Sequence, residues 1–505
     1  MTFGILVLVI FVCAAVLMFL RKLPAILALP LMAVAIGFLQ IIAGNLTFDD
    51  LSIAIIADGA IRLSDPMVIS FFGGMLSLLM QKSGIAESLV KRGAELAGDN
   101  PWMVALVMLG IIAVLFTTIG GLGAVIMVGT IVLPILSSIG VREHVGAGVV
   151  LFGISLGGVL NANNWAVYKS VLLLPDDAVS SYALWVFVAV ALMAVVFVTV
   201  ELVRSRTVRL RSLAPSLGWL AAAAGALALV RWLLDAVIGP SVMEMLRWSV
   251  LMGFALILLH AFVVYRRRRH AGGEAGLRWY AYLIPIIPLL LILLFKMSFV
   301  TAFLCGLVYG VIVTLRRGSL NMTSRALIEG SASVIPAVVL MIGIGMLLSA
   351  ILGPTRTGPG KSWYDKQIVS PSVVSQTSVA STPEWPVLTD MKPLLETIVP
   401  RSMFAYVFIF SLLGPLALYR GPLNIWGLGY GVGGILLATG VSPGAVMGIL
   451  MSLGIIQGVS DPTNTQNVWI ANELRMDVNT IMWRTLPFAW GVAILGLIVA
   501  GMRFF

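Results

Sequence analysis

Long apolar runs separated by short polar segments dominate the chain. Runs of about 17–25 residues recur along it, from residues 3–20 and 23–43 to a last run at 484–502. A helix of about 20 apolar residues crosses a hydrocarbon core roughly 30 Å thick. Because only helices and closed barrels satisfy their backbone groups in lipid, the pattern predicts an all-α polytopic membrane protein.

Basic residues mark the loops that we expect to face the cytoplasm. Arg21 and Lys22 follow the first run, and the Arg204–Arg211 and Arg266–Arg269 segments follow later ones. The positive-inside rule makes these loops cytoplasmic and places the N- and C-termini outside. We expect about 12 spans and two further pairs of apolar arms. The expected spans are 3–20, 23–43, 65–81, 145–174, 182–203, 214–237, 244–264, 279–295, 297–315, 332–352, 442–474 and 484–502, and the arm pairs are 101–117 with 122–138 and 401–419 with 423–440.

The two halves of the chain repeat one order of elements with opposite topology. In each half an arm pair with a Gly-containing tip is followed by a long span that polar residues interrupt, at Asn161–Trp165 and at Ser460–Trp469. Gly121 and Gly421 each precede their interruption by about 40 residues. Inverted repeats of this kind build many secondary transporters around a site at the membrane midplane. The sequence therefore predicts an inverted-topology repeat with two re-entrant helical hairpins and two broken transmembrane helices.

The repeat divides the chain into three parts. The linker between the repeats carries two extra transmembrane helices, and the second repeat contains an extracytoplasmic loop of unassigned purpose. The predicted parts are repeat 1 at 1–203 (scaffold helices 1–81, transport elements 101–174), the linker at 204–278, and repeat 2 at 279–505 (scaffold helices 279–352, loop 353–392, transport elements 401–474).

Composition excludes several classes of protein. Of 505 residues, 60% are hydrophobic and 11% charged, whereas soluble domains carry about 25% charged residues. The net charge of +10 lies in loops between apolar runs, so we read it as a topology signal and expect no nucleic-acid partner. Cys13 and Cys305 fall inside apolar runs and the three histidines are far apart. No disulfide, metal cluster or cofactor is expected, apart from Na⁺ as one option for a coupling ion, and no nucleophile with a neighbouring base suggests an enzyme.

Chemistry is expected where the helices are interrupted. An unpaired backbone group in hydrocarbon costs several kcal/mol, so such breaks persist where protein, ions or substrate supply partners. Helix N-termini that restart there attract anions, and freed carbonyls with Asn, Ser or Thr oxygens can ligate Na⁺. The candidate substrate-binding residues are Thr117, Thr118, Gly120, Gly121, Asn161, Asn163, Asn164, Arg420, Gly421, Asn424 and Thr463, and the candidate cation-binding or coupling residues are Asn161, Ser460, Asp461, Asn464, Thr465 and Lys169.

Plainer roles stay open for several of these residues. Thr117 and its neighbour can simply hydrogen-bond to their own helix. Arg420 suits a forked contact with carboxylate or phosphate, or else it ends a fully spanning helix at the interface. Lys169 either snorkels to the outer surface or takes the place of a coupling cation. Asp461 is the strongest candidate, because a carboxylate inside an apolar span marks a functional site by default.

With hairpins, broken helices and inverted repetition together, the chain resembles members of the ion transporter superfamily, which includes divalent-anion/sodium symporters, citrate symporters and gluconate permeases. The resemblance is most specific at Thr117–Ala124, Asn161–Trp165, Tyr419–Asn424 and Ser460–Trp469. It implies a homodimer in which a fixed scaffold carries a transport domain that slides as an elevator. Sodium-coupled dicarboxylate members typically carry Ser-Asn-Thr at both tips. The tips here read Thr-Thr-Ile-Gly-Gly and Tyr-Arg-Gly-Pro-Leu-Asn, which leaves the coupling ion open between H⁺ and Na⁺.

The function expected from these features is cation-coupled symport of a small organic anion, such as a di- or tricarboxylate or a sugar acid. The expected setting is a bacterial-type cytoplasmic (inner) membrane, with the anion, the coupling cation, membrane lipid and a second copy of the chain as partners. Two alternatives remain. In a cation/proton antiporter, Asp461 would be the exchanging carboxylate and Arg420 would be structural. The chain could also be the membrane subunit of a multi-component permease.

Overall fold

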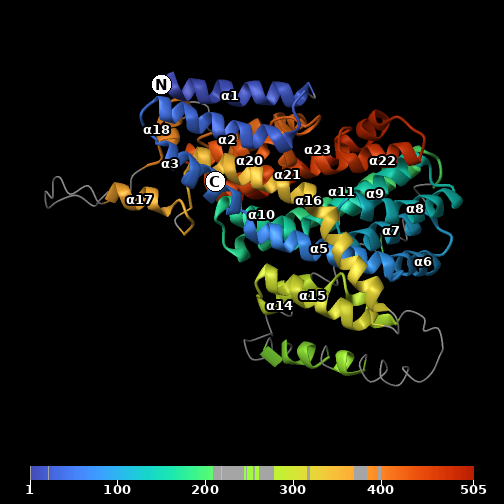
Figure 1. Ribbon diagram of the computed structural model, residues 1–505. Coiled ribbons are helices and arrows are strands. Elements are labelled where there is room, and N and C mark those ends of the chain that lie inside the picture. Colours follow the sequence, from blue (N-terminus) through green and yellow to red (C-terminus); the bar gives the residue numbers. More distant parts are fainter. Residues whose placement is uncertain are drawn as a thin grey trace. The chain divides into compact units, whose positions relative to one another are not determined.

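The computed structural model describes residues 2–20, 22–208, 218, 244–245, 247–253, 256–260, 278–315, 319–355, 357–368, 384–395 and 400–505. Within these ranges every regular element is a helix (Figure 1). Six of the helices are long and apolar enough to cross a membrane, and a seventh candidate is the pair formed by α9 (Glu143–Val159) and α10 (Ala162–Leu172). The expectation of an all-α polytopic membrane protein is confirmed.

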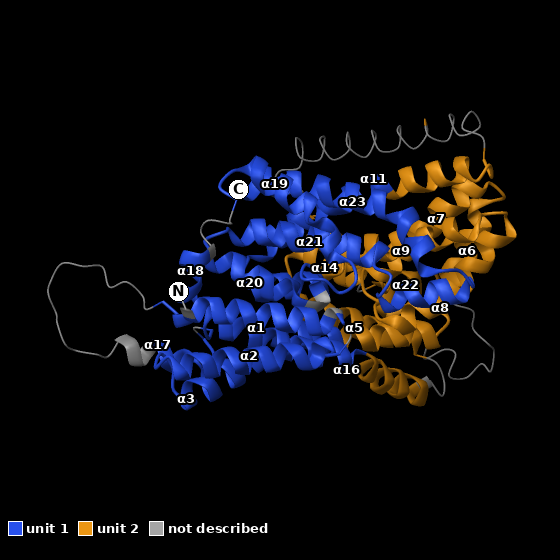
Figure 2. Ribbon diagram, turned by 90° about the horizontal axis from the view of Figure 1, so that it is seen from above, with its two compact units in different colours: residues 1–71, 163–193, 334–505 blue, residues 72–162, 194–333 orange. Residues whose placement is uncertain are grey.

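Two compact units make up the fold, and each contains segments from both halves of the sequence (Figure 2). Unit 1 is Met1–Phe71, Asn163–Met193 and Val334–Phe505, and unit 2 is Phe72–Ala162 and Ala194–Ser333. The boundaries of the two repeats, and the division into scaffold and transport elements, stay predictions.

Unit 1 holds the elements of the second arm pair and the second interrupted span. In this unit α21 packs along α23, α1 packs against α2, and α18 contacts both α1 and α20. The elements of unit 1 are α1 (Thr2–Phe19), α2 (Ala25–Ile42), α3 (Phe48–Asp50), η1 (Leu51–Ala57), α4 (Asp58–Ile61), the start of α5 (Ser64–Lys82), most of α10, the first part of α11 (Asp176–Arg204), the last part of α16 (Ser319–Leu352), α17 (Lys361–Ile368), α18 (Pro386–Leu395), α19 (Met403–Leu412), η3 (Gly414–Ala417), η4 (Ile425–Gly429), α20 (Tyr430–Ala438), α21 (Pro443–Ser460), α22 (Thr465–Glu473) and α23 (Val478–Phe504).

Unit 2 holds the first arm pair. Its arm α7 (Pro101–Phe116) packs along α9 and against α6 (Ile85–Ala97). Asn100 starts α7 by accepting a hydrogen bond from the Trp102 amide, and Pro101 occupies the first turn, where no amide is needed. The further elements of unit 2 are the end of α5, α8 (Leu122–Ser138), the end of α11, η2 (Trp279–Leu283), α14 (Ile287–Phe295), α15 (Phe299–Thr314) and the start of α16.

Two predicted spans differ from the structure. The third span is longer than the expected 65–81, because a capping box at Thr47 starts the helix and a π-helical stretch carries it onward, giving a run over Phe48–Lys82. The span expected at 279–295 is instead a 3-10 turn followed by a nine-residue helix. Pro285 and Pro288 explain the interruption, since neither has an amide hydrogen to donate. The expected helix at 214–237, apart from Gly218, and the Arg266–Arg269 segment lie outside the described residues, and 244–264 is described only in part.

Glycines pack the third spans of the two halves in reciprocal contacts. In unit 1, a Cβ on Gly59 would lie 2.5 Å from the Cα of Met346. In unit 2, a Cβ on Gly330 would lie 2.5 Å from the carbonyl oxygen of Gly74. Gly59 and Gly330 each follow an acidic residue, and fifteen positions later each half reads Gly-Met-Leu, at Gly74 and Gly345. The two contacts therefore join equivalent pairs of positions, as expected if a two-fold axis relates the two halves.

Candidate solute site at the hairpin tips and helix breaks

The arms of the second pair are too short to cross a membrane singly. Helix α19 has 10 residues, about 15 Å at the usual rise, and the 3-10 stretch η3 adds about 8 Å. The returning arm, η4 with α20, covers 14 residues in all, or about 20 Å. Both fall short of the roughly 30 Å core. Short arms are what a re-entrant hairpin needs, and the depth of its tip stays a prediction.

The tip of the second pair has a strained backbone. Tyr419 and Arg420 have φ values of 54° and 56°, in the left-handed region that costs a residue with a Cβ roughly 1–2 kcal/mol. Gly421 follows them, and a Cβ there would lie 2.1 Å from the carbonyl oxygen of Leu416. Consecutive strained residues persist only where their surroundings hold them, and they concentrate at functional sites.

Asp461 holds this tip. It lies between α21 and α22 and is only 1% exposed. Its Oδ1 accepts hydrogen bonds from the Tyr419 amide at 2.9 Å and from the Thr463 amide and hydroxyl at 2.9 and 2.8 Å. Its Oδ2 accepts one from Asn424 Nδ2 at 3.2 Å. A buried carboxylate needs such partners, so Asp461 clamps the strained tip to the break in the helix.

The first half contains the equivalent contact, within unit 2. Asn161 lies between α9 and α10, and its Nδ2 donates to the carbonyl oxygens of Phe116 at 3.1 Å and Ile119 at 3.5 Å. Ile119 and Asn161 are 42 residues apart, as are Tyr419 and Asp461. The polarity is opposite, because an amide donates to tip carbonyls in the first half and a carboxylate accepts from a tip amide in the second. In each half, the residue at the break binds the tip of its own arm pair.

The other candidates at the first tip include two threonines that make hydrogen bonds at the end of α7. Thr117 Oγ1 lies 2.7 Å from the carbonyl oxygen of Val114 and 2.8 Å from that of Pro285, and its single proton is available to either. Thr118 Oγ1 lies 3.5 Å from the carbonyl oxygen of Leu115. The contacts with Val114 and Leu115 stay within their own helix, whereas the contact with Pro285 reaches a segment far along the chain. The glycines at 120 and 121 are exposed, and φ is +81° at the second of them.

Side-chain amides satisfy the carbonyls that the second break frees. Asn464 Nδ2, Gln466 Nε2 and Asn467 Nδ2 donate to the last turn of α21 at 3.3, 2.8 and 3.1 Å. Their acceptors are the carbonyl oxygens of Gln457, Gly458 and Val459. A helix C-terminus normally needs such partners. The break is therefore a built feature of the protein rather than a frayed helix.

Two further predicted residues of the second break lie beside this cluster. Ser460 Oγ hydrogen-bonds Thr485 Oγ1 of α23 at 2.9 Å, and Thr465 is exposed at the start of α22.

The remaining predicted residues lie on α10. Lys169 forms an ion pair with Asp176 at 2.7 Å, with both side chains partly exposed. Asn163 Oδ1 accepts from Ser70 Oγ at 3.0 Å, and Asn164 is half-buried in the first turn. Unit 1 thus gathers the second tip and second break, whereas the first tip and Asn161 belong to unit 2.

Gln457 is a site residue that the sequence analysis missed. Its Oε1 accepts the Ile425 amide at 2.8 Å, which satisfies a free donor at the start of the returning arm. It lies four residues before Asp461, on the same side of a helix. A glutamine one turn ahead of the break, in an otherwise apolar run, was the signal that could have revealed it.

No family model and no curated protein matches this sequence, so the resemblance to the ion transporter superfamily gains no support. Among solved structures, the chain is similar to the YdaH transporter of Alcanivorax borkumensis, with 14% identity and a TM-score of 0.47 over 86% of this chain and 84% of that one. It is also similar to MtrF of Neisseria gonorrhoeae, described within a class of antimetabolite efflux pumps, with 13% identity and a TM-score of 0.45 over 87% and 80%. Likenesses this distant carry no argument, and the function has to be argued from the residues of this chain.

Proposed function

We propose that the chain is a secondary transporter that moves a small organic anion together with a cation, either H⁺ or Na⁺. The observation that carries the proposal is the repeated link between tip and break, at Ile119 with Asn161 and at Tyr419 with Asp461. Non-helical backbone inside apolar spans, held by equivalent residues of two repeats, is the arrangement by which transporters build solute sites.

Arg420 is the group proposed to bind the anion. Its side chain is exposed and makes no ion pair within the described part of the chain. The tip that carries it is tied through Asp461 to Thr463, two residues before α22 begins. The N-terminus of α22 adds a partial positive charge. A planar guanidinium binds carboxylate through two parallel hydrogen bonds, which favours an organic acid as the solute.

Asp461 is the group proposed to couple the cation. It is buried among neutral donors and has no ion pair with any described residue. A proton on the carboxyl group would remove an acceptor from the tip, and a bound Na⁺ would compete with the same donors. Either ion would therefore change how firmly the tip is held. We propose that this link connects ion binding to movement of the hairpin, with elevator-like sliding of the transport elements as the larger motion.

The same carboxylate supports cation/proton antiport as a second candidate function. Asp461 would then exchange the two ions, and Arg420 would only shape the tip. Counterflow of labelled organic acids in proteoliposomes separates the two functions, because an antiporter gives none. Counterflow by the purified chain alone also tests whether it works as a subunit of a larger permease.

The first experiment is a thermal-shift screen of organic acids with and without Na⁺. A ligand that binds only the folded protein raises its stability by RT ln(1 + [L]/Kd). We expect at least one organic acid to stabilise the wild type, and Arg420→Lys to weaken that shift because the forked contact is lost. Arg475→Lys is the matched control, since Arg475 is also exposed with a left-handed backbone, at φ 53°. Equal shifts in both variants would remove Arg420 from the site.

A further inference from the structure

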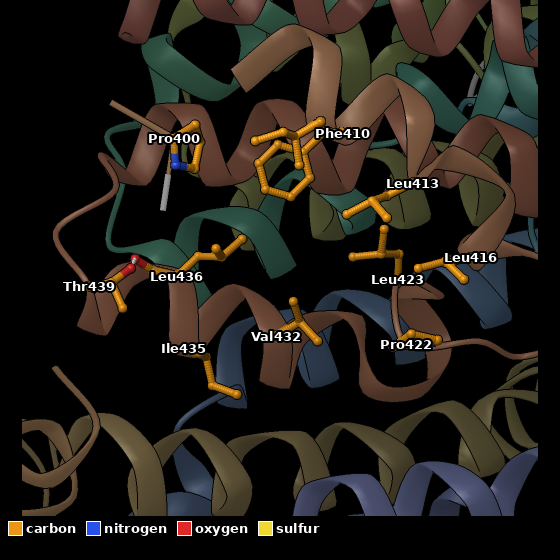
Figure 3. Close-up of a pocket in the computed structure, with 11 residues that line it drawn as sticks. Pro400, Phe410, Leu413, Leu416, Pro422, Leu423, Val432, Ile435, Leu436 and Thr439 are labelled. Atoms are coloured by element: carbon orange, nitrogen blue, oxygen red, sulfur yellow. Dashed lines mark hydrogen bonds between the residues drawn. The ribbon is translucent and has the colours of Figure 1, made fainter. Parts of the chain in front are cut away.

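An apolar cavity of about 260 Å³ lies between the two arms of the second hairpin. Phe410 and Leu413 line it from the first arm, and Val432 and Leu436 from the returning arm (Figure 3). Figure 3 shows Pro400 at the end away from the tip. The cavity therefore extends between the arms from the base of the hairpin toward its tip.

This cavity is unsuited to water. Thr439 is the one residue of its lining with a polar side chain, and its hydroxyl donates to the carbonyl oxygen of Leu436 at 2.7 Å. A buried water needs two to four polar partners, so an apolar cavity stays dry and binds apolar ligands instead. An empty cavity would forfeit the dispersion contacts of its walls. A flexible hydrocarbon chain fits both its shape and its chemistry.

The first arm has a hydrocarbon environment on its outer face. Phe404, Phe408 and Leu412 are 80%, 60% and 63% exposed, and they recur at a spacing of four residues along α19. The rings of the two phenylalanines are stacked, with centroids 6.2 Å apart. In a polytopic membrane protein such a ridge faces lipid chains. Helix α19 thus presents this ridge on one face and the cavity-lining Ile409 and Phe410 on another.

Positive charge lies at the base of the cavity. Arg401 directly follows the lining residue Pro400, and its side chain is exposed. Helix α19 begins two residues later, with Ser402 as its N-cap accepting from the Ala405 amide at 3.2 Å. A helix N-terminus and a guanidinium both favour phosphate.

We propose that the cavity binds one acyl chain of an anionic phospholipid whose phosphate lies at Arg401 and the N-terminus of α19. The proposal rests on the hairpin being re-entrant, and not on the identity of the solute. The lipid chain fills the space between the arms and reaches toward Leu423, close in sequence to the tip that Asp461 holds. The bound lipid is then part of the hairpin and keeps its arms apart.

Native mass spectrometry of delipidated protein tests this site. Titration with phosphatidylglycerol and with phosphatidylcholine of the same chain length should show one tight lipid, with the anionic one preferred. Val432→Phe fills the cavity and should weaken that binding at least tenfold, whereas Phe408→Trp, on the outer face of α19, should not change it. Arg401→Gln should weaken phosphatidylglycerol about fivefold, the effect of one basic residue near anionic lipid, and leave phosphatidylcholine unchanged.

A second measurement on the wild type avoids any folding defect in the variants. A phospholipid with a photoreactive acyl chain should label residues of both arms that line the cavity. Labelling confined to the exposed ridge of α19, or tight lipid retained by Val432→Phe, would overturn the proposal. Loss of solute-induced stabilisation in Val432→Phe, with lipid binding intact, would assign the cavity to the solute instead. Absence of transport with lipid binding intact would defeat the proposed function and leave the lipid site standing.

Discussion

Replacing Asp461 by asparagine removes one charge and almost no volume, at the centre of the proposed site. In the wild type, Oδ1 accepts from three donors and Oδ2 from one. An asparagine that keeps its oxygen in the place of Oδ1 must direct its own amide at Asn424 Nδ2, and two donors then face each other. If Asn424 turns its amide over, it gives up its bond to the carbonyl oxygen of Ala417 instead.

The cost follows from these contacts. Hydrogen bonds to a charged group contribute about 1.5–3 kcal/mol each and neutral ones about 0.5–1.5, and an unsatisfied buried donor costs about 1–3 kcal/mol. Asp461→Asn loses at least one bond and weakens three others. We expect a destabilisation of about 2–4 kcal/mol, centred on the tip.

Thermal unfolding of the purified protein in detergent measures this effect. Asp477→Asn is the matched control, because Asp477 is an exposed N-cap of α23 and asparagine caps helices about as well as aspartate. We expect a clear drop in apparent melting temperature for Asp461→Asn and little change for the control. Equal behaviour of the two variants would refute the clamp assigned to Asp461.

Four other substitutions, with one control, test the remaining geometry by the same unfolding assay. Arg420→Gly relieves the left-handed strain and should raise stability by about 0.5–1 kcal/mol while abolishing binding of the organic acid; lower stability would show that the tip is not strained. Gly59→Ala and Gly330→Ala should each lower the free energy of unfolding by about 1–3 kcal/mol, because the new methyl group meets backbone atoms. Gly110→Ala is the control and should be neutral or stabilising, since a Cβ there would have nothing within 4 Å. Similar effects at all three glycines would contradict the reciprocal contacts. Asn161→Ala leaves two carbonyl oxygens near the first tip without a donor and should lower the free energy of unfolding by about 1–3 kcal/mol. Faster proteolysis near residues 117–121 should accompany it. No change in stability or proteolysis would show that Asn161 does not hold the first tip.

The sequence singled out the residues at the two breaks but not the contacts that hold them. Polar residues inside apolar spans identify Asn161 and Asp461, since burial of such groups is costly without a role. Their partners could not be foreseen, because they are mainly backbone atoms of the tips. The bond from the Tyr419 amide depends on a left-handed turn, and neither Tyr nor Arg favours that conformation.

The start of the third span also could not be predicted, because its charged residues bind the beginning of the 353–392 loop. The third span was expected to start only at residue 65, which left Asp58 and Arg62 outside it. In unit 1 both are tied to the start of this loop: Asp58 Oδ2 accepts the Thr355 amide at 2.7 Å, and Arg62 Nη1 donates to the carbonyl oxygen of Gly353 at 2.9 Å. The arginine thereby caps the C-terminus of α16, where positive charge is favourable. Charges inside a span are tolerated when helix ends satisfy them, and no pattern along the chain shows which ends will be near.

Gradient-driven uptake of the stabilising organic acid into proteoliposomes tests the central proposal most directly, with wild type, Arg420→Lys and Asp461→Asn compared under imposed Na⁺ and H⁺ gradients. Arg420→Lys should take up less anion at low concentration because its affinity falls, and its dependence on the ion should remain. Asp461→Asn should lose the response to the gradient while still binding the anion at high concentration. Uptake equal to that of the wild type in both variants would contradict the assignment of anion and cation to these two residues.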